Sequence, residues 1–370
     1  HKRRNTTKIY RKSRLEEVKV QNKAYKFRIY PNQEQSVLFA KTFGCVRFIY
    51  NQMLADKIKY YKETGLMLHN TPAQYKQEFE WLKEVDSLAL ANAQMNLQIA
   101  YNNFFRNKNI GFPKFKSKKR SKLSYTTNNL NNSIRIEDGK LKLPKVGYVK
   151  IKLHRQIPTD HKIKSATISK NPSGKYYVSI LVEYEFEQPN IKLNKDKSIG
   201  LDYSSGSFYV DNQGTKADYP KFYRKAQSKL AKEQRKLSLM KLHSKNYEKQ
   251  KIKVARLHEH IANQRKDWLH KLSKNLADKY DYVCIEDINL RNISQGLNLG
   301  KSTADNGFGV FKEFLKYKLF DRGKQLLTID KWFPSSKMCS NCGCIKDELA
   351  LSERTYKCDC GFVCDRDQNA

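Results

Sequence analysis

The sequence lacks any apolar stretch of about 18 or more residues, the length that a helix needs to cross a bilayer. We therefore expect no membrane span, and a role at a membrane surface is only a weak rival. Acidic residues are also scarce. The chain has 37 Asp and Glu against 72 Lys and Arg, which gives a formal net charge of +35 and an isoelectric point near 9.7. This imbalance indicates a polyanionic partner.

Nucleic acid is the polyanion that the composition fits best. Lysine and arginine neutralise phosphates and release counterions, and the 22 Tyr and 18 Phe offer faces on which unpaired bases stack. A solvated basic surface or tail is the plain alternative, but the positive charge is spread along the chain. At 370 residues the chain can hold two or three domains.

Cysteine is rare, but four of the eight cysteines form two tight pairs near the end of the chain: Cys339, Cys342, Cys358 and Cys360. Four thiolates suit tetrahedral Zn²⁺ in a closed structural site, so the pairs predict a zinc ribbon. Disulfides in a secreted protein are the alternative. The absence of an apolar signal run favours a reducing compartment. The second pair is one residue shorter than usual, so Cys344 or Cys364 remains an alternative ligand.

The first third of the chain predicts a strand followed by helices. Residues 1–22 resemble a basic arm, and because the chain does not begin with Met we expect the natural start to lie upstream or to have been removed. Residues 24–30 alternate like a strand. Asn32 and Gln35 form a helix capping box, and further helices are expected to begin at Thr71 and near Asp86.

From Gly111 the pattern changes to a basic, aromatic loop and then to short alternating segments. Turns at Asp138-Gly139 and at residues 171–174 separate predicted strands that run to residue 184. Together with residues 24–30 they predict a small β-barrel that the helical module interrupts. Lysines on its strands either line nucleic acid or simply face solvent.

The second half begins after a polar linker at residues 187–197. A strand at 198–203 carries Asp202 at the tip of a hairpin with 208–210. Residues 221–280 predict a polycationic helical hairpin, and 282–287 predict a buried strand that ends at Glu286. A polar loop at 292–308, a helix at 309–321 that ends at Gly323, and a strand at 325–329 follow.

Three acids lie at the ends of apolar elements: Asp202, Glu286 and Asp367. An ordinary carboxylate near solvent is the plain interpretation of any one of them. Gathered around Mg²⁺ or Mn²⁺, the three would compensate one another, and such ions activate water and stabilise the leaving 3′ oxygen in phosphodiester cleavage. Acids on two strands and one helix are what an RNase H-like nuclease core requires. With the helical module and the small β-barrel of the first half, the sequence predicts an α+β multidomain fold.

Several segments resemble the TnpB proteins of bacterial insertion sequences, which are compact RNA-guided DNA nucleases akin to type V CRISPR effectors. The resemblance spans nearly the whole chain and rests on these segments: AYKFRIYPN at 24–32, FGCVRFIYN at 43–51, FPKFK at 112–116, GLDYS at 200–204, IED at 285–287, SSKMCSNCG at 335–343 and DRDQNA at 365–370. In the family the last motif continues as a helix past Ala370.

The resemblance implies a domain order. It comprises a basic arm and first wedge strand (1–31), a helical recognition lobe (32–110), a wedge β-barrel (111–190), RuvC nuclease motifs I and II (191–337), a zinc ribbon insert (338–363) that binds the target nucleic acid, and the start of RuvC motif III (364–370). Asp202, Glu286 and Asp367 match the catalytic, magnesium-binding triad, and Asp365 is the alternative to the third. We also hypothesise that the zinc positions Asp367.

The resemblance further implies an RNA-guided DNA endonuclease that uses Zn²⁺, Mg²⁺ (or Mn²⁺) and a guide RNA, cuts double-stranded DNA next to a short motif, and works in the bacterial cytoplasm on the nucleoid. Residues expected to contact nucleic acid are Lys26, Arg28, Arg47, Lys114, Lys116, Lys118, Arg224 and Arg235. Three alternatives remain: a guided DNA-binding repressor with a dead nuclease, a zinc-ribbon RNA-binding protein without activity, and a strand-transfer or accessory transposase protein.

Overall fold

The computed structural model describes residues 19–107, 109–204, 206–289, 305–330, 333–350 and 353–369. The chain forms two compact units, His1–Glu187 and Gln188–Ala370, and each is described by itself. No helix in these ranges is long and apolar enough to cross a membrane.

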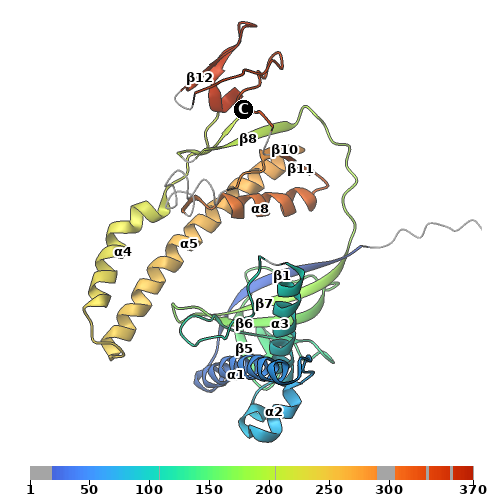
Figure 1. Cartoon of the computed structure of the whole chain (residues 1–370), viewed down its shortest axis with the longest axis vertical. Coiled ribbons are helices and arrows are strands. Elements are labelled where there is room, and N and C mark those ends of the chain that lie inside the picture. Colours follow the sequence, from blue (N-terminus) through green and yellow to red (C-terminus); the bar gives the residue numbers. More distant parts are fainter. Residues whose placement is uncertain are drawn as a thin grey trace, which may run out of the picture. The chain divides into compact units, whose positions relative to one another are not determined.

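The first unit is built on a seven-stranded antiparallel sheet in the order β2-β6-β7-β1-β5-β4-β3 (Figure 1). The strands are β1 (Lys19–Tyr30), β2 (Leu123–Asn128), β3 (Arg135–Glu137), β4 (Lys140–Leu143), β5 (Gly147–Lys152), β6 (Lys162–Lys170) and β7 (Tyr176–Phe186). The first strand lies at the centre, between β7 and β5, so the sheet forms only when the segments on either side of the helices come together.

The helices of the first unit begin where the sequence predicts. In α1 (Gln33–Thr64) the capping box of Asn32 and Gln35 is formed in both directions. Thr71 precedes α2 (Pro72–Glu78), and the short 3₁₀ helix η1 (Glu80–Glu84) follows. The Asp86 side chain caps α3 (Ser87–Arg106) by accepting from the backbone N–H of Leu88 at 3.1 Å.

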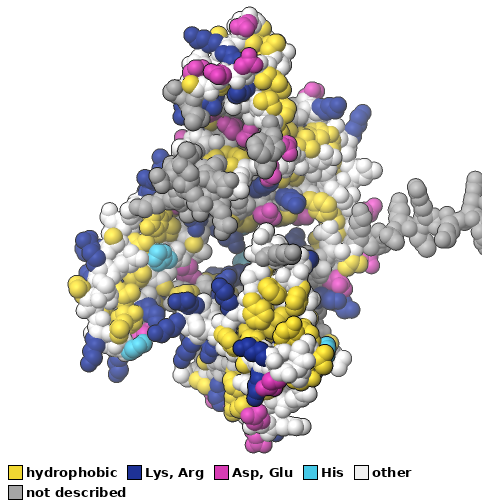
Figure 2. Space-filling view, in the orientation of Figure 1, with side chains coloured by type: hydrophobic (Ala, Val, Ile, Leu, Met, Phe, Trp, Pro, Cys, Tyr) yellow, Lys and Arg dark blue, Asp and Glu magenta, His cyan; other side chains and the backbone are white. Residues whose placement is uncertain are grey.

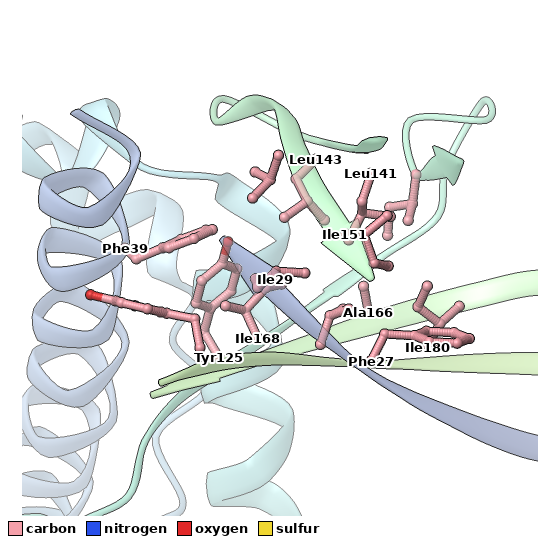
Figure 3. Close-up of a cluster of buried hydrophobic side chains, with 14 of the residues drawn as sticks. Phe27, Ile29, Phe39, Tyr125, Leu141, Leu143, Ile151, Ala166, Ile168 and Ile180 are labelled. Carbon is pink, nitrogen blue, oxygen red and sulfur yellow. The ribbon is translucent and has the colours of Figure 1, made fainter. Parts of the chain in front are cut away.

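The sheet and α1 share one hydrophobic core. Figure 3 shows Phe39 of α1 directed toward Tyr125 of β2, with Ile29 and Ile168 beneath them. The centroids of the Phe39 and Tyr125 rings lie 6.2 Å apart. A second cluster, which includes Ile49, Leu54 and Leu90, joins α1 to α3. The helical module is therefore anchored to the sheet through buried aromatic rings.

The second unit contains a four-stranded sheet in the order β11-β10-β8-β9. Its strands are β8 (Ser198–Ser204), β9 (Phe208–Asp211), β10 (Tyr282–Glu286) and β11 (Gln325–Ile329). Strands β8, β10 and β11 are parallel, and β9 returns as the antiparallel hairpin partner of β8. Carboxyl ends of parallel strands meet at one edge of a sheet, where ligands of such sheets commonly bind.

Helices cover one face of this sheet. The hairpin of α4 (Phe222–Ser238) and α5 (Lys245–Lys279) extends from it, and α8 (Phe308–Phe320) packs beside the carboxyl-terminal part of α5 (Figure 1). Leu201 and Ile285 of the sheet share a core with Leu276 of α5 and Phe311 of α8. A two-stranded hairpin, β12 (Thr355–Lys357) and β13 (Val363–Asp365), leads into the single turn α9 (Arg366–Asn369).

Gly323 is the glycine with the closest backbone neighbour in the part of the chain described. It has φ of +71°, and a Cβ atom there would lie 2.1 Å from the carbonyl oxygen of Pro189. We expect Gly323→Ala to destabilise the protein by at least about 2 kcal/mol and to lower Tm by roughly 5 °C or more, measured by thermal unfolding. Gly65→Ala is the matched control, because Gly65 also has φ of +71° but no atom within 4 Å. Equal shifts would assign the effect to φ alone.

Three sequence predictions need correction or limits. Strand β1 begins at Lys19, because residues 19–22 pair with 183–186 of β7, so the predicted arm of residues 1–22 is wrong at its end. Asp202 lies inside β8 opposite Val210, since the hairpin ladder continues to Ser204. Residues 1–18 of the predicted arm lie outside the described ranges. Residues 292–304 of the predicted polar loop at 292–308 also lie outside them.

Candidate functional site

Two parallel strands bring Asp202 and Glu286 together. In the register of β8 and β10, Leu201 pairs with Ile285, so the next residues, Asp202 and Glu286, lie at the same level on neighbouring strands. Side chains alternate along a strand, and Leu201 and Ile285 face the helical core. The two carboxylates therefore project from the opposite face, at the carboxyl edge of the sheet.

The third acid arrives from a separate element. Asp367 lies in α9, which contacts both β8 and β9. Its backbone N–H donates to the Asp365 side chain at 2.9 Å. Asp202, Glu286 and Asp367 line one cavity of about 410 Å³, which Ser335, Ser336, Arg354 and Arg366 complete. The three acids thus come from two strands and one helix and share one open, polar site.

Electrostatics of this cavity favour a cation. Burial and the negative charges of Glu286 and Asp367 raise the pKa of Asp202 to about 7. Two positive groups line the cavity: the charge of Arg366 lowers the pKa of Asp202 in part, and Arg354, which is 74% exposed, lies 3.8 Å from Asp367. Carboxylates that repel one another in a polar cavity are a donor set that suits a hard divalent cation such as Mg²⁺.

The sequence assigns no role to two neighbours of the acids. The Ser335 hydroxyl donates a hydrogen bond to Oε1 of Glu286, and Ser335 is only 9% exposed. Arg354 forms the ion pair with Asp367. Ser335 falls in a segment that resembles the TnpB family, which is the signal that could have singled it out. Nothing in the sequence pattern marks Arg354.

The four paired cysteines form a compact cluster. Their sulfur atoms all lie within 4.8 Å of one another, with Cys339 and Cys360 3.8 Å apart and Cys342 and Cys358 3.6 Å apart. Four sulfurs at about 2.3 Å from a tetrahedral Zn²⁺ would be separated by about 3.8 Å, so the spacing fits zinc. None of the eight cysteines is joined in a disulfide in this structure, and the sulfur separations of 3.6 and 3.8 Å favour the zinc site over the disulfide alternative.

Backbone and side-chain donors surround the sulfurs. The backbone N–H of Phe362 and the side chain of Asn341 donate to Cys360, and these contacts lower the pKa of its thiol to about 6. Backbone N–H groups of Cys344 and Cys360 donate to the sulfurs of Cys342 and Cys358, although hydrogen bonds among the clustered thiols and burial raise the pKa of both thiols overall. Such donors favour thiolates, the form that binds metal. The alternative ligands Cys344 and Cys364 lie outside the cluster.

The residues expected to contact nucleic acid are spread over both units. Lys26 and Arg28 lie on β1, and Lys26, Lys114 and Lys118 are exposed. Lys116 is half-buried, with its ammonium 3.7 Å from the centroid of the Tyr50 ring, and burial lowers its pKa. It lines a cavity of about 300 Å³ together with Arg47.

Arg224 and Arg235 are exposed on α4. Figure 2 shows Lys and Arg side chains over the visible surface of the α4–α5 hairpin. Exposed members on α4 include Lys225, Lys229, Lys232 and Lys236. The predicted basic face is therefore present on this hairpin, as a surface that attracts phosphates.

Three segments match known protein families. Residues 21–65 match a family described as "Helix-turn-helix domain", residues 179–296 match OrfB_IS605, described as "Probable transposase", and residues 308–370 match "Cas12f1-like, TNB domain". The last match contains the four-cysteine cluster and Asp367.

Relatives cover most of the chain. A protein named "Putative RNA-guided DNA endonuclease" from Streptomyces pristinaespiralis is 34% identical over 361 residues, covering 94% of this chain and 87% of that protein. "Putative RNA-guided DNA endonuclease InsQ" from Escherichia coli K12 is 31% identical over 361 residues, covering 90% and 87%.

A solved structure shares the fold. The Cas12f1 chain of a Cas12f1-sgRNA-target DNA complex superposes with a TM-score of 0.57 at 12% identity, over 95% of this chain and 97% of that one. The architecture is therefore a Cas12f1-like α+β fold. The identity to the Streptomyces protein, over nearly its whole length, shows the kinship directly. This chain belongs to the TnpB family, as the resemblance of its motifs predicts.

Proposed function

We propose that this protein is an RNA-guided DNA endonuclease, in which a guide RNA pairs with one DNA strand and the carboxylate cavity cuts DNA beside a short motif. The observation that carries the proposal is the meeting of Asp202, Glu286 and Asp367 in one cavity. The names of the two relatives and the DNA and guide RNA in the Cas12f1 complex support the choice of partners.

Asp202, Glu286 and Asp367 would hold Mg²⁺ or Mn²⁺, which when bound supplies an activated water and stabilises the leaving 3′ oxygen. The chain supplies the rest of the site. Ser335 fixes the Glu286 carboxylate by donating a hydrogen bond. Arg354 and Arg366 line the same cavity and offer positive charge to a DNA phosphate.

The finer domain assignment is part of this proposal. The seven-stranded sheet would be the wedge barrel and α1–α3 the recognition lobe, which together hold the guide and its duplex. The four-stranded sheet would be an RNase H-like RuvC core, since its parallel strands place acids at the carboxyl edge. The four-cysteine cluster would be a structural zinc ribbon.

Two alternatives, the inactive repressor and the zinc-ribbon RNA-binding protein, do not require a site of three carboxylates, so neither explains why the three acids line one cavity. Strand transfer remains the second candidate, because one matching family is described as "Probable transposase". Joining of DNA strands by the protein without a guide would support it.

The first test is to sequence the RNA that co-purifies with the protein and then supply matching DNA with Mg²⁺. We expect a discrete RNA species and cutting of the matching DNA. If no discrete RNA appears and no guide supports cutting, the proposed function is wrong.

The raised pKa of Asp202 predicts how the site takes up a cation with pH. Below about pH 7 a cation must displace the proton of Asp202, so Mn²⁺ affinity should rise with pH up to about 7 and then level off. Titration of Mn²⁺ at pH 5.5 to 8, followed by electron paramagnetic resonance of the free ion, measures this. In Asp202→Asn, Mn²⁺ should bind more weakly and its affinity should no longer rise between pH 5.5 and 7. If the affinity of this variant still rises as in the wild type, the titrating group is not Asp202.

A further inference from the structure

One side chain joins the loop at Met338–Ser340, here called the zinc loop, to the turn that carries Asp367. Asn369, the last residue of α9, is 6% exposed. Its Oδ1 accepts a hydrogen bond from the backbone N–H of Ser340 at 3.0 Å, and its Nδ2 donates to the carbonyl oxygen of Met338 at 2.6 Å. Met338 and Ser340 lie directly before and after Cys339. The amide of Asn369 therefore contacts the peptide groups on both sides of Cys339, a member of the four-cysteine cluster.

The side-chain amide of Asn369 matches the hydrogen-bonding groups of the peptides around Cys339. Cys339 is 1% exposed, its N–H donates to the carbonyl of Cys344 and its carbonyl accepts from Gly343. The neighbouring peptide groups of Met338 and Ser340 offer one acceptor and one donor, which the Asn369 amide matches with one donor and one acceptor. Because the amide is buried, loss of either bond leaves an unsatisfied polar group in the loop.

The same turn fixes Asp367. Helix α9 contains only Arg366–Asn369, so Asp367 and Asn369 are two residues apart on one short segment. Apart from the Asn369 bonds, the turn is held by the Asp365 side chain, which accepts from the Asp367 N–H, and by the Arg354–Asp367 ion pair. The Arg366 N–H also donates to the Arg354 carbonyl at 2.8 Å, and the Arg366 side chain donates to the Ala350 carbonyl at 2.9 Å. A shift of the zinc loop is therefore passed through Asn369 to the segment that places Asp367 in the cavity.

We propose that Asn369 is a positioning residue, which transmits the geometry of the cysteine cluster to Asp367. The inference rests on the proposed nuclease site, and it names the side chain through which the zinc ribbon acts. Because coupling between two sites is reciprocal, Asn369 also links cation binding at the carboxylates to retention of zinc.

The test compares Asn369→Ala with Gln368→Ala, a control in the same turn whose side chain lies toward Gly214. The first readout is Mn²⁺ affinity of the protein without guide, counting only the binding that Asp202→Ala abolishes. We expect Asn369→Ala to weaken it by about 10- to 100-fold, to slow guided cleavage similarly, and to lose zinc to a chelator faster, with guide RNA affinity unchanged. Gln368→Ala should match the wild type in all four.

A double variant tests the path itself. If Asn369 is the link, Cys339→Ser should weaken Mn²⁺ binding less in the Asn369→Ala background than in the wild type. Additive losses, or wild-type Mn²⁺ affinity in Asn369→Ala, would overturn the inference. Should Asn369→Ala not fold, Asn369→Ser replaces it with the same expected weakening. Since Mn²⁺ and zinc are measured without guide or DNA, a protein that shows the coupling but never cuts would refute the nuclease and not the coupling.

Discussion

Replacement of Asp202 by alanine is expected to lower guided cleavage by at least about 1000-fold, because in the proposed mechanism its carboxylate would help to hold the catalytic cation. Glu286 and Asp367 are the other acids that line the cavity, and both belong to the same proposed set, so neither is free to replace Asp202. Guide RNA and target DNA should still bind, since we expect basic surfaces outside this cavity to hold most of their phosphates. Single-turnover cleavage and a binding titration measure the two properties separately.

The matched control for Asp202→Ala is Asp287→Ala. Asp287 follows Glu286 directly, but its side chain is 64% exposed and pairs with Lys312 outside the cavity. Cleavage by Asp287→Ala should stay close to that of the wild type. Metal-dependent cleavage that survives in Asp202→Ala at the wild-type rate would remove the cavity from the mechanism.

Substitution of Cys339 by serine should have the second largest effect. Cys339 is the most buried of the four clustered cysteines, and a structural zinc site contributes about 10 kcal/mol or more of binding free energy to folding around it. We expect zinc content to fall and cleavage to drop at least about 100-fold, because the loop and Asp367 lose their position. Guide RNA affinity should change much less. Metal analysis, cleavage and RNA binding on one preparation give all three values.

Cys344→Ser is the control for this experiment. Cys344 is exposed and lies outside the cluster, and its contact with the sulfur of Cys342 comes from the backbone. Zinc content and cleavage should be unchanged. Loss of zinc from Cys344→Ser would contradict the ligand assignment. Equal loss of cleavage and RNA binding in Cys339→Ser would mean that the ribbon only keeps the domain folded.

Local signals in the sequence predict the elements well. The capping box of Asn32 and Gln35, the caps at Thr71 and Asp86, and the positive-φ Gly323 after α8 all depend on residues a few positions apart, which contact one another whatever the tertiary structure. The cysteine pairs belong to the same class. Where pairing with a distant strand decides a boundary, as for residues 19–22 of β1, local patterns fail.

The site was predictable in part. Acids after apolar strands indicate Asp202 and Glu286 as candidates. Their adjacency depends on the register of β8 against β10, and these strands are separated by more than 70 residues of sequence, so no local pattern reveals that register. The contacts of Ser335 with Glu286 and of Asn369 with the peptide groups around Cys339 join segments through single side chains. Hydrogen bonds of this kind leave no periodic pattern in a sequence.

Guided cleavage of DNA is the central claim, and one measurement tests it most directly. Purified protein is loaded with the RNA that co-purifies with it and is given Mg²⁺ and two DNA duplexes, one complementary to the guide segment and one with that segment scrambled. We predict that only the complementary duplex is cut, and that Asp202→Ala binds it without cutting. Equal cutting of both duplexes, or cutting that does not require the RNA, would contradict the account.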